Sequence, residues 1–482
     1  MTMSRFWIFC WSLPTTSSGS WNQMKTGYES EKVGGLVKIA VIGGGISGLG
    51  TAFVMGRRIP GAKIDVFEKN TTPGGTISSY RNEGFLMETG PNGFLSGKPT
   101  TLKIVDMLEK QDTLLPADSK AEKRMIVKHG RLVTLPDKPL KFFSSSILSF
   151  GGKLRIMKEP FIAKKTGDED ETIAEFGKRR LGEQAVTWML DPMVSGVFAG
   201  NVDKLSLASC FPRIHELEME YGSLVKAMMK LRSKKASPSG RLTSFENGMG
   251  QLIEMMVAAD AFRLHPGIEI REVQKEGDGF HLDHVRGAYD AVVLAVPAYS
   301  LAEMVIPGLE GLKQDLASIP YPPMAVVPFA VKKGIASGFG FLIPSVEKRD
   351  ILGALYSSGI FPNRGTDEHD LVTVMLGGDR HYEVREMGLA ELVDKASEEL
   401  AGFLKVERRE LENIGLFRWQ RAIPQYYTGH YKIVEKVEEA SASVPGLFVT
   451  GNAFYGIGIN DCTLAAFKIA EKVQNYLTED GE

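Results

Sequence analysis

The feature that most constrains this chain is a glycine-rich turn that directly follows an apolar strand pattern. Residues 37–42 (VKIAVI) form a nearly continuous β-branched and apolar run, which is typical of a buried parallel strand. The run leads into GGGISG, a GxGxxG motif at Gly43, Gly45 and Gly48, and a helical pattern follows. The first glycine permits a tight turn, the second lets the backbone approach a pyrophosphate, and the third lets the helix pack closely on the strand. The pattern predicts an α/β fold with a Rossmann-like dinucleotide-binding domain.

An acidic residue at the end of the next strand pattern indicates which dinucleotide binds. Residues 64–68 read as a second strand that ends in Glu68, 20 residues after the last glycine of the motif. A carboxylate there can accept both hydroxyl hydrogens of an adenosine ribose and would repel a 2′-phosphate, which favours FAD or NAD(H) over NADP(H). The pair Gly74-Gly75 follows, and in flavoproteins with two dinucleotide-binding domains such a pair passes close to the pyrophosphate. The pair favours FAD, although Thr76 stands where many of those proteins carry Arg or Lys.

The C-terminal part of the chain repeats the order of strand, glycine loop and helix. Residues 446–449 read as a strand that is followed by Gly451 and Asn452. A second glycine loop, residues 456–461, leads into a helix from Cys462, with Asp461 as its expected N-cap. The positive end of such a helix stabilises negative charge on a reduced flavin ring, so this unit is expected to close the same site.

Strand patterns between these two units assign more of the chain to the same domain. Residues 289–296 predict a further buried strand, and residues 268–273 and 280–282 predict antiparallel strands in which the backbone of Val273 reaches the adenine. The FAD-binding domain is therefore expected to be discontinuous and to comprise residues 37–100, 240–300 and 435–482, with other domains inserted between these segments.

Composition and charge argue against several other classes of protein. Lys and Arg number 57 against 59 Asp and Glu, a net charge of −2 without the basic excess of a typical nucleic-acid-binding protein. The three cysteines lie far apart with no metal-ligand spacing, so we expect a reducing, cytoplasmic compartment and no disulfide framework or metal site. The longest uncharged stretch, residues 441–460, contains proline and several glycines and is not expected to form a lipid-exposed helix.

The first 36 residues differ from the rest of the chain. They hold a short apolar run at residues 6–11 followed by Ser, Thr and Gly, and the strand pattern begins abruptly at Val37. We expect a disordered leader or a mis-called start, and a weak secretory signal peptide is the alternative.

Three further stretches carry a specific resemblance. They are residues 88–95 (ETGPNGFL), residues 195–201 (SGVFAGN) and residues 417–426 (FRWQRAIPQY). With the flavin motifs, they make the chain resemble the FAD-dependent protoporphyrinogen oxidases of the flavin amine oxidase-like superfamily, from about Val37 to about Leu477. The resemblance implies a mainly helical, membrane-facing domain at residues 101–239 and an α+β substrate domain at residues 301–434.

The implied reaction is the six-electron oxidation of protoporphyrinogen IX to protoporphyrin IX, with flavin N5 rather than a catalytic side chain carrying the chemistry. The implied cofactor is FAD, held by Gly43, Gly44, Gly45, Ile46, Ser47, Gly48, Glu68, Gly74, Gly75, Thr76, Gly90, Pro91, Asn92, Gly93, Val273, Trp419, Gly451, Asn452, Ile457, Gly458 and Ile459. The candidate substrate-binding residues are Asn92, Lys98 and Phe339, with Lys98 at the rim for a propionate. Coproporphyrinogen III oxidation, another amine-oxidase-like flavin oxidase and a non-catalytic FAD-binding scaffold stay open, as does a homodimer.

One basic stretch bears on localisation. Residues 138–165 contain seven Lys or Arg and one acid, a net charge of +6, interleaved with aromatic and aliphatic residues. Such a stretch can lie on an anionic membrane, and it can equally be a packed helix with a solvated charged face. We expect a cytoplasmic protein, with peripheral contact at the inner face of the membrane if the first interpretation holds.

Overall fold

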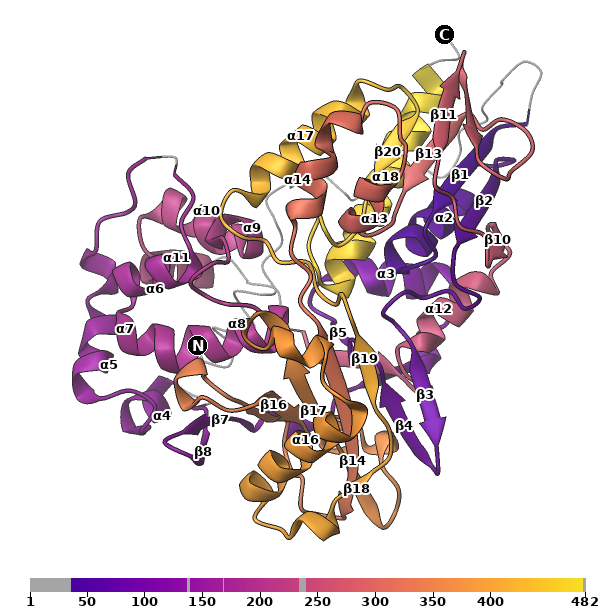
Figure 1. Ribbon diagram of the computed structural model, residues 1–482. Coiled ribbons are helices and arrows are strands. Elements are labelled where there is room, and N and C mark those ends of the chain that lie inside the picture. The colour runs from indigo at the N-terminus through magenta and orange to yellow at the C-terminus, as the bar shows by residue number, and fades with distance from the viewer. Residues whose placement is uncertain (1–35, 137–138, 168, 234–239, 480–482) are drawn as a thin grey trace.

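A five-stranded parallel sheet carries the glycine-rich turn in the computed structural model, which describes residues 36–136, 139–167, 169–233 and 240–479. Of the expected leader, residues 1–35 lie outside the described residues. The strands stand in the order β10-β2-β1-β13-β20, and every neighbouring pair is parallel. Segments that are distant in the chain therefore meet in one sheet (Figure 1), whose strands are β1 (Lys38–Ile42), β2 (Lys63–Glu68), β10 (Arg263–Pro266), β13 (Ala291–Leu294) and β20 (Leu447–Val449).

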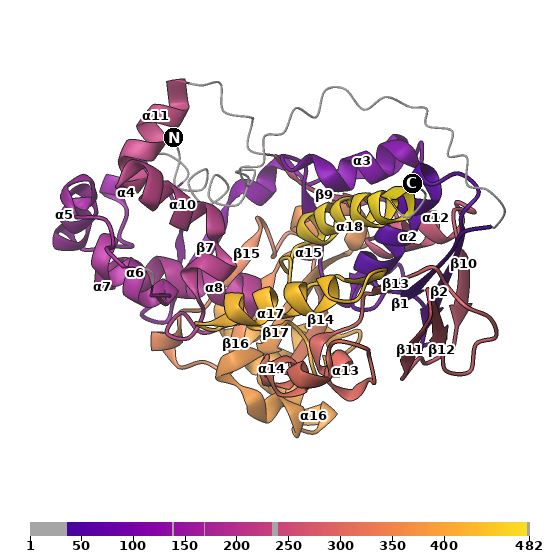
Figure 2. The same ribbon diagram turned by 90° about the horizontal axis from the view of Figure 1, so that it is seen from above.

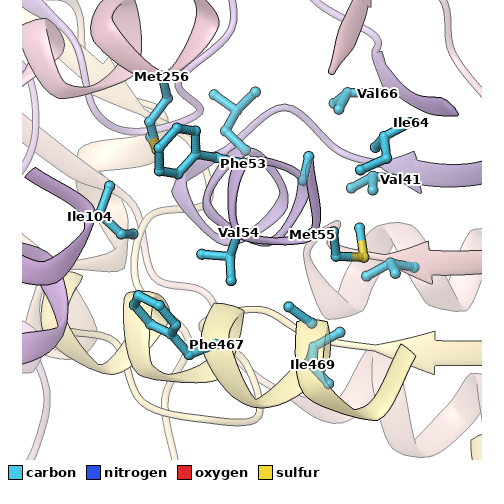
Figure 3. Close-up of a cluster of buried hydrophobic side chains, with 14 of the residues drawn as sticks. Val41, Phe53, Val54, Met55, Ile64, Val66, Ile104, Met256, Phe467 and Ile469 are labelled. Atoms are coloured by element: carbon cyan, nitrogen blue, oxygen red, sulfur yellow. The ribbon is translucent and has the colours of Figure 1, made fainter. Parts of the chain in front are cut away.

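Both faces of this sheet are covered, which explains why its strands read as continuous apolar runs. On β1, Ile39 and Val41 face one core and Ala40 and Ile42 face the other. In the first core, Phe53 and Val54 project to opposite sides of α2, between neighbouring helices (Figure 3). The helices of that face are α2 (Ile46–Arg58), α3 (Pro99–Met107), α12 (Gly250–Val257) and α18 (Ile459–Glu479). The second face packs against α13 (Ala298–Glu303), α14 (Lys313–Ser318) and α17 (His430–Ala442).

No strand forms at residues 268–272 beyond an isolated parallel bridge between Glu272 and Val305, and only Val273, the last residue of the prediction, begins a strand. The hairpin that forms is β11 (Val273–Glu276) with β12 (Gly279–Leu282), in antiparallel register. Upstream of it, the N–H groups of Arg271 and Glu272 donate to the carboxylate of Asp283 at 3.0 and 3.1 Å instead of joining a strand ladder. Because the side chain of Asp283 satisfies these backbone donors, they do not need a neighbouring strand as a partner.

A second, eight-stranded sheet forms the lower part of the molecule in Figure 1. Its order is β18-β14-β17-β16-β15-β7-β8, with β19 paired to β14. The hairpin β7–β8 comes from the segment expected to be mainly helical, and β7 pairs in parallel with β15, so this sheet extends beyond residues 301–434. The strands are β7 (Arg124–Lys128), β8 (Arg131–Thr134), β14 (Met324–Lys332), β15 (Gly340–Leu342), β16 (Ile351–Leu355), β17 (His369–Gly377), β18 (Glu412–Asn413) and β19 (Phe417–Trp419), and α16 (Leu389–Leu404) packs on them.

Short helices form a separate lobe, and seen from above it lies at the opposite end of the molecule from β11 and β12 (Figure 2). They are α4 (Pro139–Ser144), α5 (Phe150–Met157), α6 (Ile173–Arg180), α7 (Glu183–Ala185), α8 (Asp191–Phe198), α9 (Leu207–Cys210), α10 (Pro212–Tyr221) and α11 (Leu224–Ser233). The remaining strands are the pair β3 (Ser79–Asn82) and β4 (Phe85–Glu88) and the small sheet of β5 (Phe94–Leu95), β9 (Leu242–Phe245) and β6 (Leu114–Pro116). No helix within the described ranges is long and apolar enough to cross a membrane.

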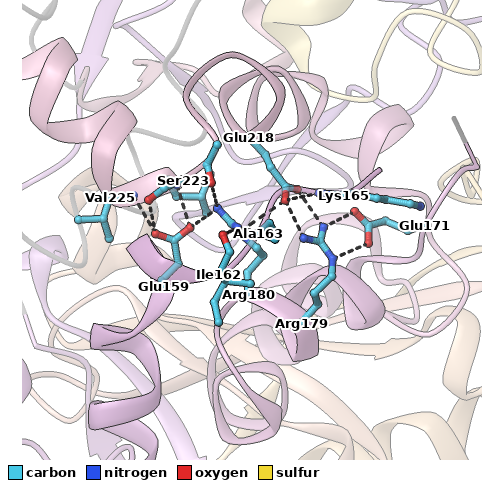
Figure 4. A network of polar contacts seen from close by, with 12 residues as sticks. Glu159, Ile162, Ala163, Lys165, Glu171, Arg179, Arg180, Glu218, Ser223 and Val225 are labelled. Carbon is cyan, nitrogen blue, oxygen red and sulfur yellow. Dashed lines mark hydrogen bonds and ion pairs between the residues drawn. The ribbon is translucent and has the colours of Figure 1, made fainter. Parts of the chain in front are cut away.

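A buried group of charges fixes this lobe (Figure 4). The guanidinium of Arg180, whose side chain is fully buried, lies 2.6 Å from Oε1 of Glu159 and donates to the carbonyl oxygens of Ile162 and Gly222 at 2.8 and 2.7 Å. Glu159 also accepts from the hydroxyl of Ser223 at 2.5 Å. Because each charge finds both an opposite charge and hydrogen bonds, burial is tolerated, and the segment after α5 is tied to α6 and α11.

Candidate cofactor site

Two glycine turns lie side by side at the carboxyl end of β1. The N–H of Gly74 donates to the carbonyl of Gly44 at 2.7 Å, and Gly45 and Gly74 form a parallel bridge. Gly43 has φ +109° and a Cβ there would lie 2.6 Å from a carbonyl oxygen, whereas a Cβ at Gly45 would meet nothing within 4 Å. The first glycine is thus required by close packing. Gly45 instead presents bare backbone to open space at the N-terminus of α2, where N–H groups and the helix dipole favour an anion.

Glu68 ends β2 beside this turn, where the sequence analysis expected the ribose to bind. Its Oε2 accepts from the N–H of Gly44 at 2.7 Å, and its Oε1 accepts from the backbone and side-chain nitrogens of Asn70 at 2.9 and 2.7 Å. A carboxylate has about four acceptor directions, so capacity for a hydroxyl remains. The sequence analysis did not identify Asn70, which holds the carboxylate in place from two residues downstream.

The loop after β4 is pressed against the second glycine turn. A Cβ at Gly90 would lie 2.2 Å from the carbonyl oxygen of Thr76, so only glycine permits this approach. The indole Nε1 of Trp419 donates to the carbonyl of Thr89 at 2.7 Å, which brings β19 of the second sheet to this loop. The side chain of Asn92 makes only a long contact of 3.5 Å with the carbonyl of Gly90. Gly90, Trp419 and the glycine turns are thus brought together, as the sequence analysis required of a shared site.

A buried carboxylate that the sequence analysis missed anchors the start of this loop. Glu88 accepts from the hydroxyl of Ser79 at 2.6 Å and the N–H of Met249 at 3.0 Å, and it lies 3.2 Å from Nη2 of Arg364. Burial raises the pKa of Glu88, and the charge of Arg364 opposes that shift. Its partners lie on β3, immediately before α12, and between β16 and β17. Because these segments are far apart in the sequence, no local sequence signal reveals the role of Glu88.

The loop between β20 and α18 is held by a buried aromatic pair. The hydroxyl of Tyr426 donates to the carbonyl of Asn452 and accepts from the N–H of Gly456 at 3.1 Å. The ring of His430 stacks on Tyr426 with centroids 4.2 Å apart, and its Nε2 lies 2.8 Å from the carbonyl oxygen of Ala453. Burial lowers the pKa of His430 to about 4, so the ring is neutral at pH 7 and serves as a donor to this carbonyl.

Asp461 is not the N-cap of the last helix, because α18 begins two residues earlier at Ile459. Its carboxylate instead lies against the glycine loop, since a Cβ at Gly456 or Gly458 would approach Asp461 to 2.7 or 2.8 Å. Oδ1 of Asp461 pairs with Nζ of Lys98 at 2.8 Å. The expected rim lysine is therefore engaged by a carboxylate of the loop, which is a different use of its charge from propionate binding.

The two remaining candidates, Val273 and Phe339, are engaged in contacts within the protein. The N–H of Val273 donates to the carbonyl of Val305 at 2.9 Å, so it is not available to an adenine. Phe339 packs in a small side cluster, with the guanidinium of Arg124 4.6 Å from its ring centroid. The neighbouring Leu342 faces α8, because a Cβ at Gly196 would lie 2.8 Å from it.

The residues at the carboxyl edge of the parallel sheet fit a bound dinucleotide. The hydroxyl of Thr450, at the end of β20, is buried and has no hydrogen-bond partner among the described residues. It shares the carboxyl edge with the open backbone at Gly45 and with the acceptor Glu68. In open α/β sheets, ligands bind outside this edge, where the free hydroxyl of Thr450 is able to bond to a ligand group.

Comparison with known proteins agrees with this arrangement. The family of flavin containing amine oxidoreductases matches residues 46–474. Protoporphyrinogen oxidase 2, chloroplastic/mitochondrial, from Arabidopsis thaliana is 28% identical over 91% of this chain and 94% of its own length. Coproporphyrinogen III oxidase from Bacillus subtilis (strain 168) is 25% identical over 88% and 95%. A solved structure from Exiguobacterium sp. 255-15 has a TM-score of 0.78 at 21% identity, over 91% of this chain and 99% of that one, so the two share a fold.

Proposed function

The chain belongs to the family of flavin containing amine oxidoreductases, and we propose that it is an FAD-dependent oxidase that converts protoporphyrinogen IX to protoporphyrin IX in haem biosynthesis. The observation that carries the substrate is the similarity to porphyrinogen oxidases, which extends over almost the full length of both chains. FAD, rather than another flavin, is supported by Glu68, whose buried carboxylate lies beside the glycine turn as an acceptor for a ribose.

When bound, the flavin accepts two electrons per turnover, so this six-electron oxidation takes three turnovers, with oxygen or another acceptor reoxidising the flavin. The residues of the chain bind, orient and exclude water. The glycine turns and the N-terminus of α2 hold phosphates, and Trp419 and Tyr426 fix the two loops on either side of the site. We assign no catalytic acid or base, since the neutral, buried His430 is used in packing and in a hydrogen bond to backbone.

We also propose a separate role for each of the three regions of the chain. The parallel sheet and its helices would bind FAD, the second sheet would form the substrate domain, and the helical lobe would face the membrane. For the lobe, the support is a set of apolar side chains exposed to solvent on and beside α4 and α5, namely Phe143 (51% exposed), Phe150 (83%), Leu154 (44%), Met157 (57%) and Phe161 (87%). We refer to these five residues as the apolar rim.

Two cations of the basic stretch are held in place by backbone carbonyls. Nζ of Lys153 donates to the carbonyls of Phe143 and Ser145 at 2.7 Å each. The guanidinium of Arg155 donates to the carbonyls of Arg180 and Arg179 at 3.1 and 2.6 Å. Both cations keep their charge in these contacts, and Lys138 lies outside the described residues. The apolar rim and the charge of the basic stretch therefore support peripheral membrane contact together.

Oxidation of coproporphyrinogen III is the second candidate, because relatives from Bacillus subtilis and Staphylococcus aureus carry that name at 25% and 26% identity. Anaerobic mixing of the purified yellow protein with each porphyrinogen in turn tests both. Faster bleaching of the flavin absorbance by protoporphyrinogen supports the proposal. Faster bleaching by coproporphyrinogen would show that coproporphyrinogen III is the substrate instead. Absence of bleaching with either would refute porphyrinogen oxidation and leave an amine-oxidase-like activity or a non-catalytic scaffold.

A further inference from the structure

A groove with no assigned role is lined by residues of α13 and α14 and by none of the residues of the glycine turns. It is widely open to solvent and has a volume of about 520 Å³. Its walls come from α13, α14, the turn before β14, the 3₁₀ helix η9 (Tyr382–Arg385) and the segment after β19. The residues that matter for recognition are Tyr299, Lys313, Tyr321, Tyr382, Arg385 and Arg421.

The aromatic walls of this groove are held in place before any ligand binds. The rings of Tyr299 and Tyr321 meet edge to face with centroids 4.9 Å apart, and the hydroxyl of Tyr321 accepts from the N–H of Ala298 at 3.1 Å. The hydroxyl of Tyr382 donates to Oδ1 of the buried Asp379 at 3.3 Å, while 39% of the residue remains exposed. Fixed aromatic walls favour a planar ring, because little side-chain freedom is lost on binding.

Two guanidinium groups in the groove lack a strong acidic partner. Arg385 donates to the carbonyls of Gln420 and Tyr321 at 3.2 and 3.5 Å, and no carboxylate lies within 4.0 Å of it in the part of the chain that the structure describes. Arg421 lies over the ring of Tyr299, 4.4 Å from its centroid. Its nearest carboxylate is that of Glu303, at 3.7 Å and with 73% of that side chain exposed, so this pair is weak.

A guanidinium stacked on a ring keeps its N–H edge free for an anion, and each arginine can bind a carboxylate through two parallel hydrogen bonds. The amine of Lys313 adds a third positive charge at the wall, whereas Glu303 is the one acid among the described lining residues and the buried Asp379 lies behind Tyr382. The groove therefore combines aromatic walls with a local excess of positive charge, in a chain whose net charge is −2.

We propose that this groove binds a planar aromatic molecule that carries two carboxylates, one for Arg385 and one for Arg421. The exposed ring of Tyr382 and the part-exposed ring of Tyr299 contact the aromatic part of this ligand, and the buried Tyr321 supports Tyr299 from behind. Binding of this ligand requires neither turnover nor a porphyrinogen, so it is tested independently of the proposed oxidase activity. The porphyrin product itself is a member of this ligand class only if the proposed function holds.

Calorimetric titration of the flavin-loaded protein with naphthalene dicarboxylate tests the proposal. We expect one saturable site, an affinity lowered at least about tenfold in Arg385→Gln and in Arg421→Gln, and weaker binding of the monocarboxylate naphthoate. The matched control is Arg131→Gln, which removes the same charge from an exposed position on β8, at the opposite end of the second sheet from β14 and β19. Flavin absorbance and the melting temperature report that each variant is folded.

Three results would overturn the proposal. They are the absence of saturable binding to the unaltered protein, an affinity that Arg385→Gln and Arg421→Gln leave unchanged, and equal affinity for the mono- and dicarboxylate. An affinity lowered as much by Arg131→Gln as by the groove variants would also overturn it, because the ligand would then be attracted by the overall charge of the protein. A variant that fails to fold is replaced by Arg385→Lys or Arg421→Lys, which keeps the charge and is expected to lose the paired hydrogen bonds and bind more weakly.

Discussion

Nζ of Lys98 lies 2.8 Å from Oδ1 of Asp461, an ion pair that joins the start of α3 to the first turn of α18. The two side chains are 28% and 33% exposed, so solvent screening limits the strength of the pair. Its importance lies in position, because Asp461 also contacts the glycine loop at Gly456 and Gly458.

The first prediction separates two uses of Lys98. We expect Lys98→Met to weaken flavin binding by a few-fold, corresponding to about 1 kcal/mol, with little change in the KM for porphyrinogen. Asp461→Asn removes the other partner and should behave alike. The affinity for flavin is measured by titrating the apo-protein with FAD and following the flavin fluorescence. A raised KM with normal flavin retention would instead return Lys98 to the rim, where it would bind a propionate.

The second prediction concerns the ribose carboxylate. In Glu68→Gln an amide replaces the carboxylate, so at most one oxygen remains to accept from Gly44 and Asn70, and in Glu68→Arg none remains. Both variants should retain less than about a tenth of the flavin, because hydrogen bonds to a charged group contribute about 1.5–3 kcal/mol each. Glu276→Gln, at an exposed position on β11, is the control. Normal flavin content in Glu68→Arg would contradict the ribose assignment.

The third prediction follows from the neutral His430. Burial lowers the pKa of His430 to about 4 from 6.5, so the unfolded chain binds this proton more readily than the folded protein. Stability is therefore lost as the pH falls from about 6.5 to about 4, by up to about 3 kcal/mol for this group. Urea unfolding at several pH values should show a flatter acid limb for His430→Gln than for the unaltered protein. Parallel acid limbs would mean that His430 does not contribute.

The fourth prediction concerns the membrane. Replacing Phe150 and Phe161 with Ser should lower co-sedimentation with anionic vesicles by about tenfold or more, because burial of one such side chain contributes about 1.5–3 kcal/mol. The melting temperature should not fall, since both side chains are exposed. Lys153→Gln is expected to lower the melting temperature through its lost contacts with Phe143 and Ser145, and to lower vesicle binding by less than the phenylalanine variant, because it removes a single charge. Vesicle binding that is nil, or unchanged in the phenylalanine variant, refutes membrane contact through the apolar rim.

The fifth prediction concerns the buried charges of the helical lobe. Arg180→Met leaves the carboxylate of Glu159 buried without its cation, at a cost of about 3–5 kcal/mol. The double variant Arg180→Met with Glu159→Leu should recover much of that loss, as measured by chemical unfolding. A double variant less stable than Arg180→Met alone would show that the hydrogen bonds of Glu159, rather than the charge pair, dominate.

The sequence predicted those parts of the site that depend on neighbours in the chain. A strand, a GxGxxG turn and the acid at the next strand end are separated by fixed steps, so Gly43, Gly48 and Glu68 could be placed from spacing alone. The engagement of Lys98 with Asp461 could not, because it depends on how α3 and α18 pack, 363 residues apart. The misplaced strand at residues 268–272 failed for a related reason, since the carboxylate of Asp283 takes up backbone groups that strand propensity alone would assign to a ladder.

The segment from Trp419 to Tyr427 has a consequence for how the protein reaches its native state. Trp419 binds the loop after β4, Gln425 donates to the carbonyl of Phe198 on α8, and Tyr426 holds the loop after β20. These contacts exist only once both sheets and the helical lobe have met, and contacts between distant parts of a chain form late because loop closure costs entropy. Docking of this segment is therefore expected to be among the last steps of folding, so a newly made chain acquires the shape of its cofactor site only when the rest of the molecule is assembled.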